Sequence, residues 1–275
     1  MRSVLLLCLI AFLLAACHED DVLPTPPSPS SRPTGALGSQ PTQEQTPPPF
    51  DVTSEVFQAG IFKNMPYRIL FPRNYDPTKS YPLHIFLHGI GERGSDNEKQ
   101  LSLGAAHFRA DSVRNQYRAF VVFPQCADGE YWVNEPVTTT LRELIDSLLK
   151  HQSIDKEKIS IGGFSMGAYG TFAMVARHPE LFHAAIAISG DGDESKASSM
   201  ARSKWRLFAG KKDDVVPSRK TEKMAKALAQ AGASVSFILY PNADHGRTWL
   251  NAFSEPDFFK WIFSEAQTPI YRGTD

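Results

Sequence analysis

The sequence contains little cysteine, little net charge and no long apolar segment. Among its 275 residues are three cysteines, and 29 basic residues nearly balance 30 acidic ones, for a net charge of −1. So few cysteines argue against a disulfide framework, and the balanced charge argues against a nucleic-acid-binding surface. The apolar run at residues 4–16 has 13 residues, fewer than the roughly 20 that a membrane-spanning helix needs. The length suits one large domain or two small ones.

The N-terminus has the pattern of a bacterial lipoprotein signal. Arg2 precedes the apolar run, which has the length of a signal-peptide core and ends in Leu-Ala-Ala-Cys at Cys17. This ending resembles a lipobox, in which the cysteine is lipidated and becomes the mature N-terminus. We therefore expect residues 1–16 to be a signal peptide and acyl chains on Cys17 to hold the protein at a membrane of the cell envelope. A plain secretory signal with an incidental cysteine is the alternative. If Cys17 is lipidated, Cys126 has no intramolecular disulfide partner.

Residues 17–50 are expected to form the lipidated N-terminus and a disordered tether. The stretch from Pro24 to Pro49 contains nine prolines with Ser, Thr, Gln and Gly, and almost no large apolar residue. Such a stretch cannot bury enough surface to offset its chain entropy. The acidic cluster at residues 18–21 resembles the surface-export signals of Bacteroidetes lipoproteins, which favours the outer membrane or the cell surface over the inner membrane. A solvated acidic patch is the alternative.

From about Glu55 onward the pattern is that of a globular α/β domain, because strand-like apolar runs alternate with helical patterns. Several of these runs are apolar without alternation, as expected for strands buried on both faces of a mostly parallel, twisted sheet with helices on both sides. We expect this domain to span residues 51–267, followed by a C-terminal tail at 268–275. The expected strands are 67–71, 83–87, 120–123, 159–162, 185–188, 206–209 and 235–240, and the expected helices are 138–151, 166–178, 218–231 and 257–266.

A G-x-S-x-G motif at residues 163–167 lies between an expected strand and an expected helix. In that context it predicts a sharp turn that presents the Ser165 hydroxyl at the carboxyl end of the sheet. Both glycines are needed, because side chains at their positions would collide with neighbouring elements. Ser165 is therefore the expected nucleophile of a serine hydrolase, and the Met166 N–H, at a helix N-terminus, is an expected oxyanion donor. A glycine-rich turn with a capping serine is the alternative.

A serine nucleophile needs a general base, and the base needs an orienting carboxylate. In a fold with this motif the partners follow the serine in the order acid, then histidine. His245 lies in a loop after the last expected strand, near the C-terminus, so it is the expected base. His183 stands at the start of a strand and is expected to be structural.

The loop at residues 210–217 reads G-K-K-D-D-V-V-P. It resembles the G-x-x-D-x-x-V-P loop of many α/β-hydrolases, in which the aspartate is the triad acid. Alignment of the glycine and the proline places Asp213 in that position, with Asp214 as the runner-up. Asp191, which follows another strand, is a third candidate. Asp244, next to the expected base, is expected to shape its loop.

An H-G-x-G turn at residues 88–91 follows another expected strand. Such a turn supplies the second oxyanion donor in this fold. The Ile90 N–H is the expected donor, paired with that of Met166. His84 and His88 are four residues apart but lie at a strand end, and no further ligand cluster accompanies them, so we expect no metal site. No cofactor is expected.

These motifs, with the segments at 81–83, 86–97 and 123–126, resemble bacterial α/β-hydrolases related to feruloyl esterases, polyhydroxybutyrate depolymerases and dienelactone hydrolases. Some members of that group are labelled "predicted peptidase". The resemblance covers about residues 60–265 and implies an α/β-hydrolase fold. It also implies a triad and an oxyanion hole at the positions named above: Ser165, Asp213 and His245, with Ile90 and Met166.

Only residues 189–205 connect two strands that flank an inserted cap in many relatives. We therefore expect no large cap domain and an open cleft that suits an ester on a bulky or polymeric scaffold. Arg93, Trp132 and Trp249 are candidate walls of the cleft, and each also has a structural interpretation. The expected function is carboxylic-ester hydrolysis through an acyl-enzyme, on acetyl or feruloyl groups linked to carbohydrate. The alternatives are a serine peptidase, a lysophospholipase or thioesterase of the same fold, and a non-catalytic surface lipoprotein that binds acylated glycans.

Overall fold

The structure, a computed structural model, describes residues 50–263 and 271–272. The expected signal peptide at 1–16, the lipidation site Cys17 and the expected tether up to residue 49 lie outside the described residues. Among the helices that are described, none has both the length and the apolar character to cross a membrane.

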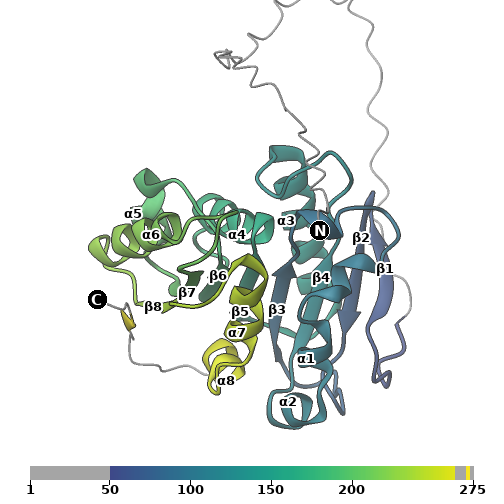
Figure 1. Cartoon of the computed structure of the whole chain (residues 1–275). Helices are drawn as coiled ribbons and strands as arrows, with labels where there is room; N and C mark the ends of the chain where they lie inside the picture. Colours follow the sequence, from purple (N-terminus) through teal and green to yellow (C-terminus); the bar gives the residue numbers. More distant parts are fainter. Residues whose placement is uncertain (1–49, 264–270, 273–275) are drawn as a thin grey trace, which may run out of the picture. The chain divides into compact units, whose positions relative to one another are not determined.

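The described part of the chain forms a nine-stranded sheet (Figure 1) in the order β1-β2-β4-β3-β5-β6-β7-β8-β9. β2 pairs antiparallel with β1 and with β4, and all other neighbours are parallel. The loops that follow β3, β5, β7 and β8 therefore emerge at one edge of the sheet. The strands are Gln58–Phe62 (β1), Met65–Leu70 (β2), Tyr81–Leu87 (β3), Phe120–Pro124 (β4), Ile154–Phe164 (β5), Ala184–Ile188 (β6), Lys204–Gly210 (β7), Val235–Tyr240 (β8) and Tyr271–Arg272 (β9).

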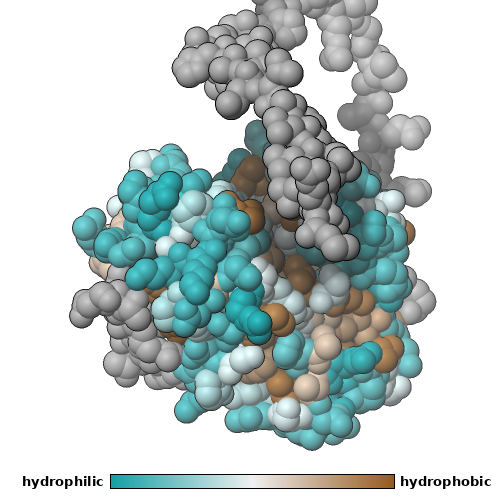
Figure 2. Space-filling model, in the orientation of Figure 1, coloured by the Kyte–Doolittle hydropathy of each residue, from teal (hydrophilic) through white to brown (hydrophobic). Residues whose placement is uncertain are grey.

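Helices cover both faces of the sheet, and Figure 1 shows α1, α7 and α8 on the near face. Figure 2 shows a mainly hydrophilic surface over α5 and α6. The α-helices are Ala105–Arg109 (α1), Asp111–Gln116 (α2), Glu135–His151 (α3), Met166–Arg177 (α4), Ala197–Met200 (α5), Ser218–Gln230 (α6), His245–Phe253 (α7) and Phe258–Phe263 (α8). The 3-10 helices are Ile90–Glu92 (η1), Lys99–Ser102 (η2) and Glu194–Lys196 (η3).

The core consists of two apolar clusters, one on each face of the sheet. α3, α4, α5 and α6 contribute to the first cluster, and α1, α7 and α8 contribute to the second. The central strand β3 supplies both clusters in alternation, since Ile85 and Leu87 belong to the first and Phe86 to the second. This explains why its sequence, apart from His84, is apolar without alternation: period-two side chains meet a core on each side.

The predicted mostly parallel sheet, with helices on both faces and no large cap, is confirmed. Residues 189–203, between β6 and β7, hold only the short elements η3 and α5. β1 was not predicted, because only one of its five residues is buried. α1 and α2 were not predicted either, because their five and six residues are too few to show a helical period.

The ends of the domain differ slightly from the expected bounds of 51 and 267. Phe50, placed in the expected tether, packs against the rings of Tyr67 and Phe71, with ring centroids 6.3 and 5.6 Å apart. β9 lies within the expected tail at 268–275 and pairs with β8 through Phe237 and Ile238.

Candidate active site

Ser165 occupies a strained turn between β5 and α4. Its backbone has φ 54° and ψ −120°, a left-handed region that costs a residue with a side chain about 1–3 kcal/mol. The flanking glycines make the turn possible. A Cβ on Gly163 would lie 2.3 Å from the Gly167 carbonyl oxygen, and a Cβ on Gly167 would lie 1.9 Å from that of Leu87. Only glycine fits at either position, and the serine is thereby held at the carboxyl edge of the sheet.

Ser165, His245 and Asp213 form a continuous chain of hydrogen bonds. Nε2 of His245 lies 2.9 Å from Oγ of Ser165, and Nδ1 lies 2.8 Å from Oδ2 of Asp213. Because a carboxylate can only accept, Nδ1 carries the proton and donates a hydrogen bond to Asp213. Nε2 is then the unprotonated nitrogen and accepts from the serine hydroxyl, which is the arrangement that a general base requires.

The carboxylate of Asp213 is held firmly below the imidazole. Its side chain is fully buried, and its second oxygen accepts hydrogen bonds from the backbone N–H groups of Val215 at 3.0 Å and Val216 at 2.8 Å. Bonds of this kind stabilise the charged form of a buried carboxylate and fix its direction. Asp213 is thus suited to orient His245.

The other candidate carboxylates have different partners. Asp214 is exposed on the same loop. Asp191 lies 3.4 Å from Nζ of Lys220. Asp244 caps α7 by accepting the N–H of Arg247 at 2.7 Å. Among the four carboxylates that the sequence offered, Asp213 is the one that contacts the imidazole.

The imidazole of His245 is also held from the side. Phe164, which precedes the serine, places its ring centroid 4.7 Å from that of His245. The histidine is the first residue of α7, directly after the cap residue Asp244. A packed ring and a capped helix end leave the base little freedom to rotate away from Ser165. Sequence analysis did not identify Phe164 in this role, because the variable positions of a G-x-S-x-G motif carry no signal of their own.

Two backbone N–H groups near Ser165 are available to an oxyanion. Met166 begins α4 and Ile90 begins η1. Within the described part of the chain, neither N–H donates a hydrogen bond. Unpaired N–H groups at the first turn of a helix favour a negatively charged oxygen. They are therefore suitable donors for the oxyanion of a tetrahedral intermediate.

His88 fixes the peptide that carries the Ile90 N–H. The ring is buried, its Nδ1 donates to the Gly89 carbonyl oxygen at 2.6 Å, and its Nε2 accepts the N–H of Cys126 at 3.0 Å. Burial lowers the pKa of His88 to about 4, so the ring is neutral at neutral pH. In a planar trans peptide the carbonyl and the N–H point in opposite directions. Holding the Gly89 carbonyl therefore also aims the Ile90 N–H.

A pair of variants at position 88 separates this hydrogen bond from simple packing. In His88→Asn the side-chain amide can replace Nδ1 and still donate to the Gly89 carbonyl, whereas in His88→Gln the amide reaches the position of Nε2 instead. We expect kcat on p-nitrophenyl acetate to fall by about tenfold or more in His88→Gln, since loss of one oxyanion donor costs about 10²–10³. His88→Asn should retain clearly more activity, with similar KM values for both. Equal losses in the two variants would show that only the volume of the ring matters.

The prediction that Trp132 lines the cleft is wrong. Trp132 has no exposed surface, and its Nε1 donates to the His88 carbonyl oxygen at 3.0 Å beneath the oxyanion loop. Its neighbour Tyr131 is the exposed residue, at 44%. The indole is buried because its N–H finds a backbone acceptor there, which a buried tryptophan needs.

The structure places Arg93 and Trp249 in partly buried packing positions. The Arg93 guanidinium donates to the backbone carbonyls of Ile90 at 3.2 Å and Glu130 at 3.3 Å, and lies 5.2 Å from the Tyr131 ring centroid. Trp249 packs edge-on against Phe253, with ring centroids 6.1 Å apart. Contact of either residue with substrate remains a prediction.

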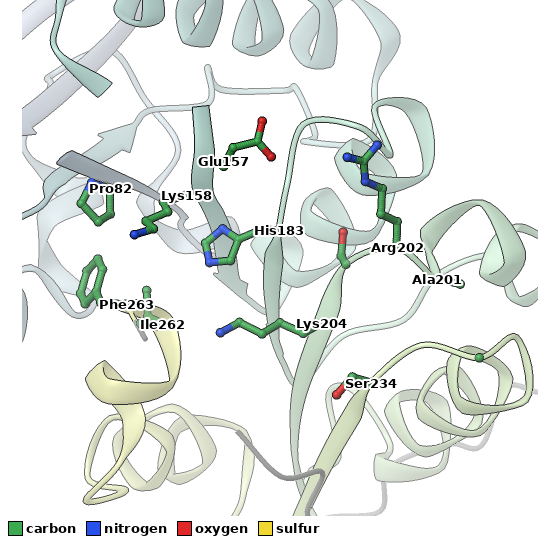
Figure 3. Close-up of a pocket in the computed structure, with 12 residues that line it drawn as sticks. Pro82, Glu157, Lys158, His183, Ala201, Arg202, Lys204, Ser234, Ile262 and Phe263 are labelled. Carbon is green, nitrogen blue, oxygen red and sulfur yellow. The ribbon is translucent and has the colours of Figure 1, made fainter. Parts of the chain in front are cut away.

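His183 is far along the sheet from the nucleophile. It stands just before the amino end of β6, and its Nδ1 donates to the Ile159 carbonyl oxygen at 2.8 Å. There it lines a cavity of about 540 Å³ with Pro82, Lys158 and Lys204 (Figure 3). These residues belong to the amino ends of the strands, whereas Ser165 follows the carboxyl end of β5. The cavity is thus separate from the triad.

The remaining candidate groups have structural environments. Burial raises the pKa of the Cys126 thiol to about 12, so this cysteine is a poor nucleophile. Burial lowers the pKa of His84 to about 3, and its Nδ1 lies 2.8 Å from Oγ of Ser160. Among the described residues, no group of three or more His, Cys, Asp or Glu side chains could hold a metal ion.

Comparisons with known proteins find similar hydrolases. The model of the Dienelactone hydrolase family matches residues 126–252. Poly(3-hydroxyalkanoate) depolymerase C of Paucimonas lemoignei is 29% identical over 133 residues, which cover 43% of this chain and 30% of that protein. A thermostable esterase of known structure is 31% identical with a TM-score of 0.73, over 78% of this chain and 64% of the esterase. The chain therefore spans less than two thirds of each.

A more distant structure shares the fold. The feruloyl esterase module from Clostridium thermocellum, complexed with sinapinate, is 16% identical with a TM-score of 0.62, over 82% of this chain and 96% of the module. The described domain thus has the α/β-hydrolase fold.

Proposed function

We propose that this chain, which contains a Dienelactone hydrolase family domain at residues 126–252, is a serine hydrolase of carboxylic esters. The observation that carries the proposal is the hydrogen-bonded chain from Ser165 through His245 to Asp213, with distances of 2.9 and 2.8 Å. If His245 were only an exposed loop histidine, or Ser165 only a capping serine, there would be no reason for three side chains from three separate loops to be hydrogen-bonded in this order.

The proposed reaction has two halves. Oγ of Ser165 attacks the ester carbonyl carbon while Nε2 of His245 takes the hydroxyl proton, and the Ile90 and Met166 N–H groups bind the oxyanion. The tetrahedral intermediate collapses, and the protonated Nε2 gives its proton to the departing alcohol, which leaves an acyl group on Ser165. Water then attacks this acyl-enzyme, with His245 as base, and releases the carboxylic acid. Asp213 orients the imidazole and stabilises its protonated form in both halves.

Esters are favoured over amides by similarity and by architecture. The thermostable esterase at 31% identity and the depolymerase at 29% identity both support ester substrates. The connection at 189–203 is too short to form a large cap over the carboxyl edge of the sheet. We therefore propose acyl groups on carbohydrate or on another bulky scaffold as substrates, with acetyl and feruloyl groups first among them. A serine peptidase or a lysophospholipase or thioesterase of the same fold remains the alternative, and the connected triad argues against a non-catalytic glycan-binding protein.

A substrate panel tests the ester assignment. We expect the purified protein to hydrolyse p-nitrophenyl esters and methyl ferulate, and to leave peptidyl p-nitroanilides unchanged, because its similarity to an esterase and a depolymerase supports ester substrates. Steady-state rates on equal concentrations of each class provide the comparison. Turnover of anilides alone would replace the esterase proposal with a peptidase.

We also propose that Cys17 anchors the protein to a membrane of the cell envelope, on the strength of the Leu-Ala-Ala-Cys pattern. Metabolic labelling with palmitate should mark the full-length chain and be lost in Cys17→Ala. Labelling that persists in Cys17→Ala would reject the anchor.

A further inference from the structure

A groove of about 300 Å³ runs along the outer side of α4. Its floor is formed by Tyr169, Phe172, Ala173 and Ala176, whose spacing of i, i+3, i+4 and i+7 places them on one stripe of the helix. The groove is hollow because the side chains of the two alanines are small. From Tyr169 to Ala176 the stripe extends about 10 Å along the helix axis, enough for a substituent well beyond acetyl.

The walls of this α4 groove come from two loops at the carboxyl edge of the sheet. One wall is formed by Val133, which is 42% exposed and belongs to the segment between β4 and α3. The other wall is formed by the segment after β6 together with Met200 of α5. Its acidic groups are engaged elsewhere: Asp193 accepts the Ser195 N–H at 3.0 Å, and Asp191 pairs with Lys220 at 3.4 Å. The groove therefore has an apolar floor, and its charged groups, which also include Lys196, lie in the wall.

The end of the α4 groove at Tyr169 is the end nearest the nucleophile along α4. The Tyr169 N–H donates to the Ser165 carbonyl oxygen at 3.2 Å, so the floor starts one helical turn from the serine. The Ser165 N–H donates to the Ile188 carbonyl oxygen at 2.9 Å. Asp191, in the second wall, is three residues beyond Ile188. The floor thus starts at a residue bonded to the Ser165 backbone, and the wall starts three residues after another.

The α4 groove and the base lie on opposite faces of the sheet. α4 packs in the apolar cluster that it shares with α3 and α6, whereas α7, which begins at His245, packs in the other cluster. The departing alcohol receives its proton from Nε2 of His245, so the alcohol part leaves on the α7 side. The acyl part stays on Oγ of Ser165 and is free to extend toward α4.

We infer that the α4 groove is the acyl-binding subsite and that it accepts apolar acyl groups larger than acetyl. The inference rests on the proposed ester hydrolysis at Ser165 and specifies its substrate class. Each methylene that passes from water into an apolar site contributes about fourfold to binding. The groove therefore makes the enzyme selective for longer or aryl-bearing acyl groups, whatever alcohol carries them, and of the two acyl groups proposed above it favours feruloyl over acetyl.

The test is an acyl-length profile: kcat/KM for p-nitrophenyl acetate, butyrate, hexanoate and octanoate. The wild type should improve with length. Ala173→Phe fills the middle of the groove and should lower the octanoate-to-acetate ratio by about tenfold or more, the value of two buried methylenes. Ala176→Phe, farther from Ser165, should affect octanoate more than butyrate. The control is Ala229→Phe on the exposed side of α6, which should keep the wild-type profile.

Three outcomes would overturn the inference. One is a wild-type profile that falls or stays flat from acetate to octanoate while esters are still turned over. A second is an unchanged profile in folded Ala173→Phe and Ala176→Phe; if one variant does not fold, the other decides. A third is a change in kcat/KM in these variants that depends on the alcohol part of the ester when the acyl group is kept the same. Failure of the wild type to hydrolyse any ester would instead reject the proposed function together with the subsite.

Discussion

Replacing Ser165 with alanine is expected to lower kcat for ester hydrolysis by about five to six orders of magnitude. Without Oγ no acyl-enzyme can form, and His245 has no hydroxyl to deprotonate. The residual acceleration over water, about 10³–10⁴, would come from the oxyanion donors and from substrate binding. The measurement is kcat on p-nitrophenyl butyrate with protein whose folding is checked by its Tm.

Ser189 offers a matched control for this substitution. It is also a buried serine with positive φ, 50° against 54° for Ser165, and it follows the neighbouring strand β6. Because its hydroxyl lies outside the triad, Ser189→Ala should remain within a few-fold of the wild-type kcat. Comparable losses in both variants would mean that loss of a buried hydroxyl at either strand end lowers activity, and that the loss in Ser165→Ala does not identify the nucleophile.

Asp213→Ala is expected to lower kcat by about four orders of magnitude, while its neighbour Asp214→Ala changes it by a few-fold at most. The alanine removes the acceptor for Nδ1–H of His245, 2.8 Å away, so the ring loses both its orientation and the tautomer that leaves Nε2 free. Asp214 is exposed on the same loop and is therefore a control for the loop itself. Parallel kcat measurements on one ester give the comparison.

Asp213→Asn sharpens this result. The amide keeps the shape of the carboxylate and can keep the bonds from the Val215 and Val216 N–H groups, but it can present an N–H to Nδ1 and favour the wrong tautomer. We therefore expect Asp213→Asn to be nearly as impaired as Asp213→Ala. A larger effect at Asp214 than at Asp213 would refute the assignment of the acid.

An element can be predicted from the sequence where its local pattern is compatible with only one structure. The glycines at 163 and 167 are such a case, because their neighbours leave no room for a Cβ. The same applies to β3, whose apolar sequence without alternation is explained by a core on each face of the sheet. The placement of the Asp213 and His245 loops at the same edge then follows from a parallel sheet.

The orientation of Trp132 could not be predicted in the same way. In Tyr131-Trp132 both rings suit either a cleft wall or a core. A contact with a residue distant in sequence determines that Trp132 is in the core. Gly170 of α4 lies so close that a Cβ there would be 2.3 Å from the Trp132 Cβ. That glycine is a signal for a close approach, but the sequence does not say which residue approaches.

His88 and the α4 groove required coordinates for a different reason. The H-G-x-G pattern marks a loop but does not show that the ring donates to the Gly89 carbonyl. The alanines at 173 and 176 look like ordinary helix residues, and only the position of Val133 and of the loop after β6 turns them into the floor of a groove. Both features arise from contacts between segments far apart in the chain.

The central claim, that Ser165 is the nucleophile, is tested most directly by trapping it. The wild-type protein is treated with a fluorophosphonate and the modified residue is located by mass spectrometry of its peptides. We expect one adduct, on Ser165, formed much more slowly in Asp213→Ala than in Asp214→Ala. An active enzyme with its adduct on another residue, or with none, would contradict it.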